Sequence, residues 1–166
     1  MNSNKPNKNN FCIFTNNQKA FVVSRAEKLN IPCFVFSKED LKRDVVLEKI
    51  NEIKPDLIVL AGFLLMFPSS IIQAYPNKVI NLHPALLPKF GGKGMYGMNV
   101  HRAVVENKEK ETGITIHFVD EKYDEGGIIF QAKTKVLDNF TAEDVAKEIH
   151  KLEYEHFPKI IERLLY

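Results

Sequence analysis

Residues Val79 to Gly97 read VINLHPALLPKFGGKGMYG, and this stretch decides the predicted fold. It opens on an apolar strand in which Asn81 and His83 stand two residues apart. On an extended backbone both side chains therefore point to the same side. Pro84 disfavours a helix at the residue before it and keeps His83 extended. Because α/β sheets bind ligands at the ends of their strands, we expect a ligand or active site here.

A second stretch, His117 to Gly127, reads HFVDEKYDEGG and follows another apolar run. It places Asp124 and two glycines in a loop. A lone Asn or His at a strand end is usually a polar residue with no more than a structural role. The two stretches together predict a site that contains an amide, an imidazole and a carboxylate.

Apolar runs and helical spacing alternate along the whole chain. The pattern predicts strands at 11–15, 33–36, 57–60, 79–80, 114–119 and 128–136. It predicts helices at 18–29, 37–53, 69–75, 100–106 and 142–165, with an interruption at Pro158 and caps at Ser37 and Thr141. The run 57–60 is expected to be buried on both faces. This alternation favours an α/β fold whose mostly parallel sheet has helices on both faces, with the last strand pair as an antiparallel addition.

Composition restricts the class of protein. A chain of 166 residues with 45% hydrophobic residues suits one domain, expected over residues 11–166 behind a disordered polar tail at 1–10. The net charge of +2 favours neither a nucleic-acid partner nor a membrane partner. No signal peptide is visible. Cys12 and Cys33 lie in apolar runs, where reduced thiols are the default, which favours a cytoplasmic location.

The motifs N-x-H-P-x-L-L-P and D-E-G-G before a strand resemble those of the phosphoribosylglycinamide formyltransferases, and the resemblance runs from about Phe11 to the C-terminus. It implies a Rossmann-like formyltransferase fold. It also implies formyl transfer from 10-formyltetrahydrofolate, as co-substrate and without a metal, to the amine of glycinamide ribonucleotide. That reaction belongs to de novo purine (IMP) biosynthesis. The partners implied are small-molecule substrates, and the oligomeric state stays open.

The resemblance implies catalytic roles for three residues. Asn81 would donate a hydrogen bond to the formyl oxygen, and His83 would stabilise or protonate the developing oxyanion. Asp124 would orient His83 and help move the proton of the attacking amine. For His117 two interpretations stay open, a neutral histidine in the core and a supporting residue behind the catalytic ones.

The resemblance also implies binding residues. The segment 61–67 would line the folate pocket, with Leu64 and Leu65 against the rings. The loop from Val119 through Asp120 to Asp124 would offer backbone groups to the pterin edge, and Glu153 would contact the substrate ribose. The glycine-rich segment 91–97 lacks the spacing of a nucleotide-binding loop, so Lys93 and Tyr96 are instead expected to cap the substrate pocket.

One part of the family pattern is missing from the sequence. The family's first strand and its phosphate-binding loop have no counterpart, because residues 11–29 match the second strand and helix. We therefore expect an N-terminally truncated domain that is poorly stable and turns over weakly. Two alternatives remain: a formyltransferase with another amine acceptor, and a catalytically impaired folate-binding fragment.

Overall fold

The computed structural model describes residues 11–166, so the predicted tail at 1–10 lies outside the described residues. Backbone contacts divide the chain into two compact units, one ending at Pro55 and the other spanning Asp56–Tyr166. Each unit is described by itself. The single domain expected over 11–166 stays a prediction.

The first unit is built on a pair of short parallel strands. Strands β1 and β2 align Ile13 with Cys33, and the rings of Phe14 and Phe34 meet edge to face with centroids 5.5 Å apart. Its elements are β1 (Ile13–Thr15), α1 (Phe21–Lys28), β2 (Cys33–Val35), α2 (Lys38–Lys42) and α3 (Val45–Ile53).

The single helix predicted at 37–53 is wrong, because two helices occupy this range. Ser37 caps α2 as expected, through a capping box in which its hydroxyl accepts from Asp40 N–H. The break comes at Asp44, whose φ of 59° is left-handed. A helix cannot continue through that conformation, so α3 starts again at the next residue.

The second unit holds a mixed four-stranded sheet in the order β3-β4-β5-β6. Strands β3 and β4 are parallel, whereas β5 pairs antiparallel with both β4 and β6. The late antiparallel addition expected from the sequence is therefore confirmed. The elements are β3 (Ile58–Leu60), α4 (Ser69–Ala74), β4 (Val79–His83), α5 (Met98–Glu106), β5 (Glu111–Phe118), β6 (Ile128–Lys135) and α6 (Ala142–Leu165).

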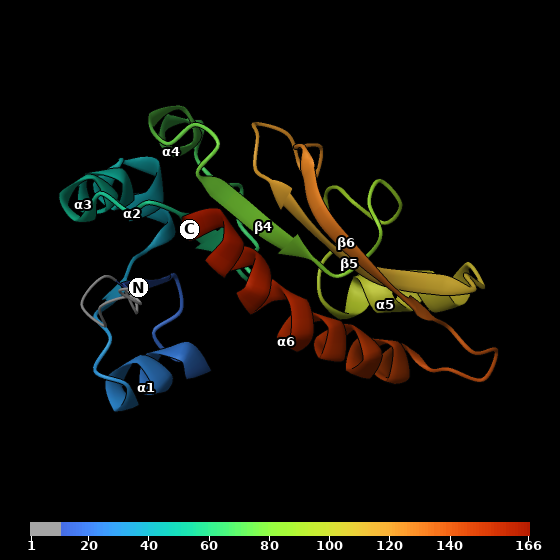
Figure 1. The fold of residues 1–166 in the computed structure, drawn as a ribbon. Helices are drawn as coiled ribbons and strands as arrows, with labels where there is room; N and C mark the ends of the chain where they lie inside the picture. Colours follow the sequence, from blue (N-terminus) through green and yellow to red (C-terminus); the bar gives the residue numbers. More distant parts are fainter. Residues whose placement is uncertain (1–10) are drawn as a thin grey trace, which may run out of the picture. The chain divides into compact units, whose positions relative to one another are not determined.

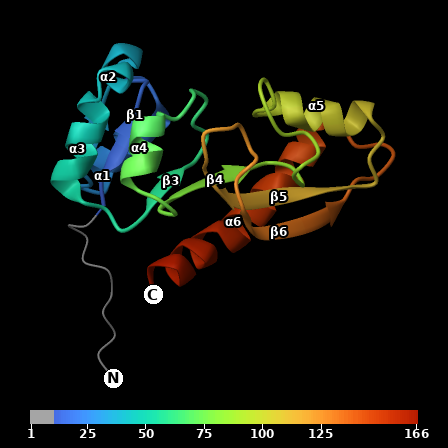
Figure 2. The ribbon, with the colours of Figure 1, turned by 90° about the horizontal axis from the view of Figure 1, so that it is seen from above.

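One face of this sheet packs on the long helix α6, which runs along β4, β5 and β6 in both views (Figures 1 and 2). Ile80 and Ile116 of the strands are fully buried against Ile160 of the helix. A neighbouring cluster joins Ile114 of β5 to Ile149 of α6. These apolar residues alternate along the strands with residues that point to the opposite face. That opposite face is left for the polar residues of the predicted site.

The interruption predicted in the last helix is wrong. Helix α6 is continuous over 24 residues and contains Pro158. Proline removes one helical hydrogen bond, but Phe157 and Ile160 on either side of it pack on the sheet and hold the helix in place. Thr141 caps the helix as predicted, with a capping box to Asp144.

Strand β3 also differs from its expectation. It was predicted to be buried on both faces, but Val59 is 36% exposed and its neighbours are half-buried. A fully apolar run of this length cannot by itself reveal whether both faces of the strand are covered. Among the described residues, no helix is long and apolar enough to cross a membrane.

Candidate active site

Polar side chains gather on one face at the end of β4. Asn81 and His83 flank Leu82, which packs toward the α6 core, so they point the other way. The strand register pairs Asn81 with His117 and His83 with Thr115 of β5. Paired residues on neighbouring strands point to the same face, so these four polar side chains form one patch.

Asp124 joins this patch from the loop between β5 and β6. Its Oδ1 lies 3.6 Å from His83 Nδ1 and 3.5 Å from His117 Nε2. Asn81 Nδ2 lies 3.2 Å from the same nitrogen of His117. The structure therefore brings together the three residues predicted to be catalytic and His117. Their chemical roles stay predictions.

Glycines make the position of Asp124 possible. Its second carboxylate oxygen, Oδ2, accepts from Gly92 N–H at 2.8 Å. At the preceding Gly91, a Cβ atom would lie 2.7 Å from Leu87 Cδ2 and 3.3 Å from Asp124 Cβ, so a side chain would push the two loops apart. Asp124 itself has a left-handed φ of 57°, an uncommon backbone conformation that is enriched at functional sites.

Two backbone carbonyls fix which imidazole nitrogens carry hydrogen. His83 Nε2 lies 2.8 Å from Phe90 O, and His117 Nδ1 lies 2.8 Å from Phe118 O. A carbonyl oxygen can only accept, so both of these nitrogens are N–H donors. When the rings are neutral, the other nitrogen of each ring has a lone pair, and these are the two nitrogens near Asp124.

With both imidazoles neutral, the patch contains more acceptors than donors. Asp124 Oδ1 and the two imidazole lone pairs lie close together. The N–H groups of both imidazoles are held by backbone carbonyls, so the amide of Asn81 is the one side-chain donor left to this cluster among Asn81, His83, His117 and Asp124. One added proton would be shared between the carboxylate and an imidazole in a charge-assisted hydrogen bond. The site is thus suited to take up a proton while Asn81 offers its second amide hydrogen to a ligand.

Burial decides the charge of the resting site. It lowers the pKa of His83, and the carboxylate of Asp124 and the carbonyl of Phe90 offset this effect only in part. Burial also acts to raise the pKa of Asp124, but the interaction with His117, the hydrogen bond from Gly92 N–H and the nearby imidazole of His83 outweigh it and leave that pKa below its usual range. A neutral His83 beside an ionised Asp124 is therefore the favoured form at neutral pH.

The neutral, buried His83 should make stability depend on pH. Its pKa in the folded state lies below the value of about 6.5 for an unfolded histidine. The unfolded chain therefore binds this proton first, and the unfolding free energy falls as pH drops through about 6.5.

Between about pH 7.5 and about pH 5.5, we expect the unfolding free energy to fall less in the His83→Asn variant than in the natural chain. Urea unfolding at the two pH values measures this difference. His101, whose pKa burial also lowers, is present in both proteins and cancels in the comparison. An equal fall in the two proteins would contradict the expectation.

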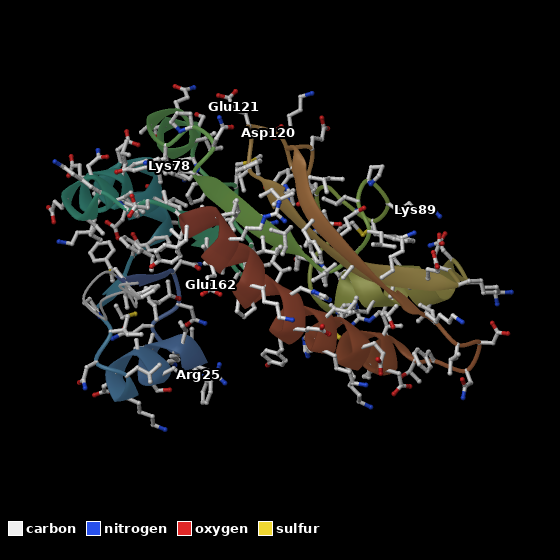
Figure 3. All side chains as sticks on the ribbon, in the orientation of Figure 1. Arg25, Lys78, Lys89, Asp120, Glu121 and Glu162 are labelled. Carbon is white, nitrogen blue, oxygen red and sulfur yellow. The ribbon has the colours of Figure 1, made fainter. Side chains whose placement is uncertain are left out.

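The predicted folate-binding residues lie in two loops of the second unit. Leu64 is 57% exposed and Leu65 is half-buried. Val119 N–H already donates to Val79 O at 2.9 Å, so this donor is not free for a pterin ring. Asp120 lies on the β5–β6 loop at one end of the sheet (Figure 3) and is exposed, and its carboxylate accepts from Lys122 N–H.

Three further predicted residues are not among the side chains that meet at Asp124. Glu153 lies half-buried on α6, which packs on the other face of the sheet. Among residues 11–166 its carboxylate makes no hydrogen bond or ion pair. Burial raises the pKa of Glu153, and nearby His150 partly opposes this. Lys93 and Tyr96 are exposed on the glycine-rich loop, so their predicted role over the substrate pocket stays a prediction.

Sequence reasoning missed the groups that hold the predicted catalytic side chains and the segment that follows His83. The carbonyl of Phe90 and the N–H of Gly92 bond His83 and Asp124. The hydroxyl of Thr115 and the amide of Gln131 bond backbone atoms of Ala85 and Leu87. Paired glycines were a usable signal for close backbone approach, whereas a threonine and a glutamine inside strands give none. Within residues 11–166, no group of His, Cys, Asp and Glu is arranged to hold a metal ion.

Comparison with known proteins agrees with the fold and the site. The family described as "Formyl transferase" matches residues 1–161. The chain therefore belongs to the formyl transferase family.

Within that family, its relatives include the phosphoribosylglycinamide formyltransferases. The chloroplastic enzyme of Arabidopsis thaliana is 36% identical over 155 residues, which cover 90% of this chain and 53% of the relative. The enzyme of Bacillus subtilis is 36% identical over 152 residues, covering 89% of this chain and 75% of that protein.

Solved structures confirm the α/β formyltransferase fold. Glycinamide ribonucleotide transformylase 1 from Geobacillus kaustophilus superimposes with a TM-score of 0.84 at 31% identity, over 93% of this chain and 82% of that one. The phosphoribosylglycinamide formyltransferase of Streptococcus pneumoniae superimposes with a TM-score of 0.83 at 26% identity, over 92% of this chain and 85% of that one. The chain spans about half the length of the two plant relatives that it matches.

Proposed function

We propose that this chain transfers a formyl group from 10-formyltetrahydrofolate to the amine of glycinamide ribonucleotide, a step of de novo purine (IMP) synthesis. The observation that carries the proposal is the meeting of Asp124 with two imidazole nitrogens within 3.6 Å, beside the amide of Asn81. The names of the relatives support the choice of substrates. We place this activity in one formyltransferase domain over residues 11–166.

The proposed reaction needs a group that takes up a proton and a group that donates a hydrogen bond to the oxyanion, and the patch offers both. The substrate amine attacks the formyl carbon, a C–N bond forms, and the carbonyl electron pair moves to oxygen. Asn81 Nδ2–H donates to this oxyanion, since its other hydrogen is held by His117. The amine loses a proton to the lone pair of His83 Nδ1, directly or through water. The oxyanion electron pair then re-forms the carbonyl, the C–N bond to the folate breaks, and the imidazolium of His83 returns its proton to the departing nitrogen, directly or through water.

The role of Asp124 in this scheme is electrostatic. Once His83 carries the proton, an imidazolium stands beside a carboxylate in a buried site. Their attraction stabilises the ion pair at the moment when the oxyanion forms nearby. His117 supports the arrangement because it holds the amide of Asn81 in the donating orientation.

For the folate we propose a pocket formed by Leu64, Leu65 and the loop that contains Val119, Asp120 and Asp124. Leu64 is exposed on the loop that follows β3, and the last residue of β3, Leu60, is the register partner of Asn81. An exposed leucine there suits the apolar face of a flat ring.

We expect a folate analogue to bind the purified chain, and the Leu64→Ser variant to bind at least ~10-fold more weakly, because a buried leucine side chain contributes about 1.5–3 kcal/mol. Leu137→Ser is the matched control, since Leu137 is similarly exposed, at 54% against 57% for Leu64, but lies after β6. Calorimetry that finds no binding to folded chain, or equal losses in both variants, would count against this pocket.

The other parts of the proposal are Glu153 as a contact to the substrate ribose and small molecules as the only substrates, with no nucleic-acid or membrane partner. Burial of Glu153 supports the first, since a half-buried carboxylate without a partner is available to accept from hydroxyl groups. We also propose a cytoplasmic location, which the two unpaired cysteines support.

The test is an assay of formyl transfer by the purified chain, with 10-formyltetrahydrofolate as donor and a panel of amine acceptors. Turnover with glycinamide ribonucleotide, and little with amino sugars or methionyl-tRNA, is the expected result. Turnover with another amine and none with glycinamide ribonucleotide would show that the proposed acceptor is wrong. Folate binding without any turnover would leave a catalytically impaired folate-binding fragment.

A further inference from the structure

Three strands place a polar row beside the catalytic patch. His83 on β4 is the register partner of Thr115 on β5, and Thr115 is the register partner of Gln131 on β6. Their side chains therefore point to the same face of the sheet. The chain that follows His83, residues 84–92, runs over this face and returns to the site.

The hydroxyl of Thr115 uses its full hydrogen-bonding capacity on this segment and on Gln131. It donates to Ala85 O at 2.7 Å, and it accepts from Leu87 N–H at 3.0 Å and from Gln131 Nε2 at 2.9 Å. A hydroxyl has one donor and two acceptor positions, so none remains free. Thr115 is also completely buried.

Gln131 completes the arrangement from the third strand. Its Nε2 donates to Leu87 O at 3.0 Å and to the Thr115 hydroxyl, which uses both amide hydrogens. Three backbone atoms of the segment, Ala85 O, Leu87 N and Leu87 O, are thereby fixed by two side chains. We call these two side chains the Thr115–Gln131 clamp.

The clamped segment leads to the groups that hold the catalytic side chains. Phe90, three residues after Leu87, accepts from His83 Nε2–H. Gly91 lies against the side chains of both Leu87 and Asp124. A shift of Leu87 would therefore be passed on to the imidazole and to the carboxylate together.

We propose that Gln131, acting through Thr115 and residues 85–92, is a positioning residue that fixes His83 and Asp124 for formyl transfer. This inference rests on the proposed function for its kinetic consequence. The hydrogen bond of His83 on which it acts can be observed without any substrate.

Thr112 offers a control within the same strand. It is 2% exposed, like the buried Thr115, but its hydroxyl has no partner among the described residues. Alternation along β5 points it to the opposite face. Thr112→Val and Thr115→Val thus remove the same atom from two buried sites of one strand, and the second alone breaks the clamp.

The experiment compares Gln131→Met, Thr115→Val, Thr115→Ser and Thr112→Val with the natural chain. The direct measurement is the imidazole N–H signal of His83 by NMR, identified by its absence in His83→Gln. We expect Gln131→Met and Thr115→Val to lose this signal by faster exchange with water. Thr115→Ser keeps the hydroxyl and Thr112→Val keeps the clamp, so both should retain it.

Kinetics give the second measurement. Misplacement of a catalytic group by 1 Å can cost about 10²-fold, so we expect kcat to fall at least ~10-fold in Gln131→Met and Thr115→Val. The KM for the formyl donor should be unchanged, and Thr115→Ser should restore kcat. A purely structural role would instead lower the amount of folded protein without this division between kcat and KM.

The outcomes separate this inference from the proposed function. A retained His83 signal in folded Gln131→Met overturns the inference, whatever the activity. If the natural chain transfers no formyl group, the proposed function fails while the NMR comparison still decides the clamp. If Gln131→Met does not fold, Gln131→Glu takes its place, because it keeps the shape of the side chain but lacks both amide hydrogens.

Discussion

Replacing His83 by Asn is expected to lower formyl transfer by at least ~10²-fold, the scale for loss of a general base or of an electrostatic stabiliser. The substitution removes the lone pair that faces Asp124 and the positive charge that this nitrogen acquires. Asparagine is smaller and polar, so the backbone of β4 should be retained. The measurement is kcat with saturating substrates, beside circular dichroism of the same sample.

A second buried histidine provides the control for that loss. His101 on α5 is 4% exposed, against 3% for His83, but it belongs to the packing between helices and its Nδ1 has no partner among the described residues. His101→Gln should keep kcat near that of the natural chain even where it changes stability. Full turnover by His83→Asn, or equal losses in both variants, would remove His83 from the mechanism.

Asp124→Asn is expected to be equally damaging while the fold stays intact. An amide can still accept from Gly92 N–H, so the loop should keep its position. Its NH2 group would face the two imidazoles and donate to the lone pairs that the reaction needs. The variant thus removes the carboxylate charge and occupies the proton acceptor, and we expect kcat to fall at least ~10²-fold.

The neighbouring Glu125→Gln is the matched control for this charge. Glu125 is exposed and pairs with Lys122 on the surface, where an ion pair contributes little. The turnover and melting temperature of Glu125→Gln should match those of the natural chain. Asp124→Asn with unchanged kcat would show that the carboxylate is dispensable, and a large drop in its melting temperature would assign Asp124 to folding.

Local patterns predicted that Asn81, His83 and Asp124 share a site because they lie on one short strand and one short loop. The i, i+2 spacing of Asn81 and His83 fixes their common face whatever surrounds them. Pro84 was expected to keep His83 extended. The structure confirms this, because His83 is the last residue of strand β4. The loop of Asp124 was visible from its two following glycines, and Gly126 is indeed required, since a Cβ there would lie 1.8 Å from Phe118 O.

The remaining features depend on contacts between segments far apart in sequence. The register that sets Thr115 opposite Gln131 includes an irregularity, because His117 pairs with Ile128 while Ile116 pairs with Phe130. Simple alternation along β6 cannot reveal this extra residue at Ile129. The break between α2 and α3 was not predicted either. A left-handed conformation at Asp44 leaves the apolar spacing of both helices unchanged, so the pattern does not reveal it.

The surplus of acceptors around Asp124 has a consequence for inhibitors. A compound that reaches this corner with a carbonyl or carboxylate would face the oxygen of Asp124 and two imidazole lone pairs. A compound that ends in an amidine or a protonated amine would satisfy all three acceptors. It would mimic the positively charged nitrogen of the adduct that forms when the amine has attacked and has not yet lost its proton. Affinity among compounds that reach this corner should therefore depend on whether the group placed there donates or accepts hydrogen bonds.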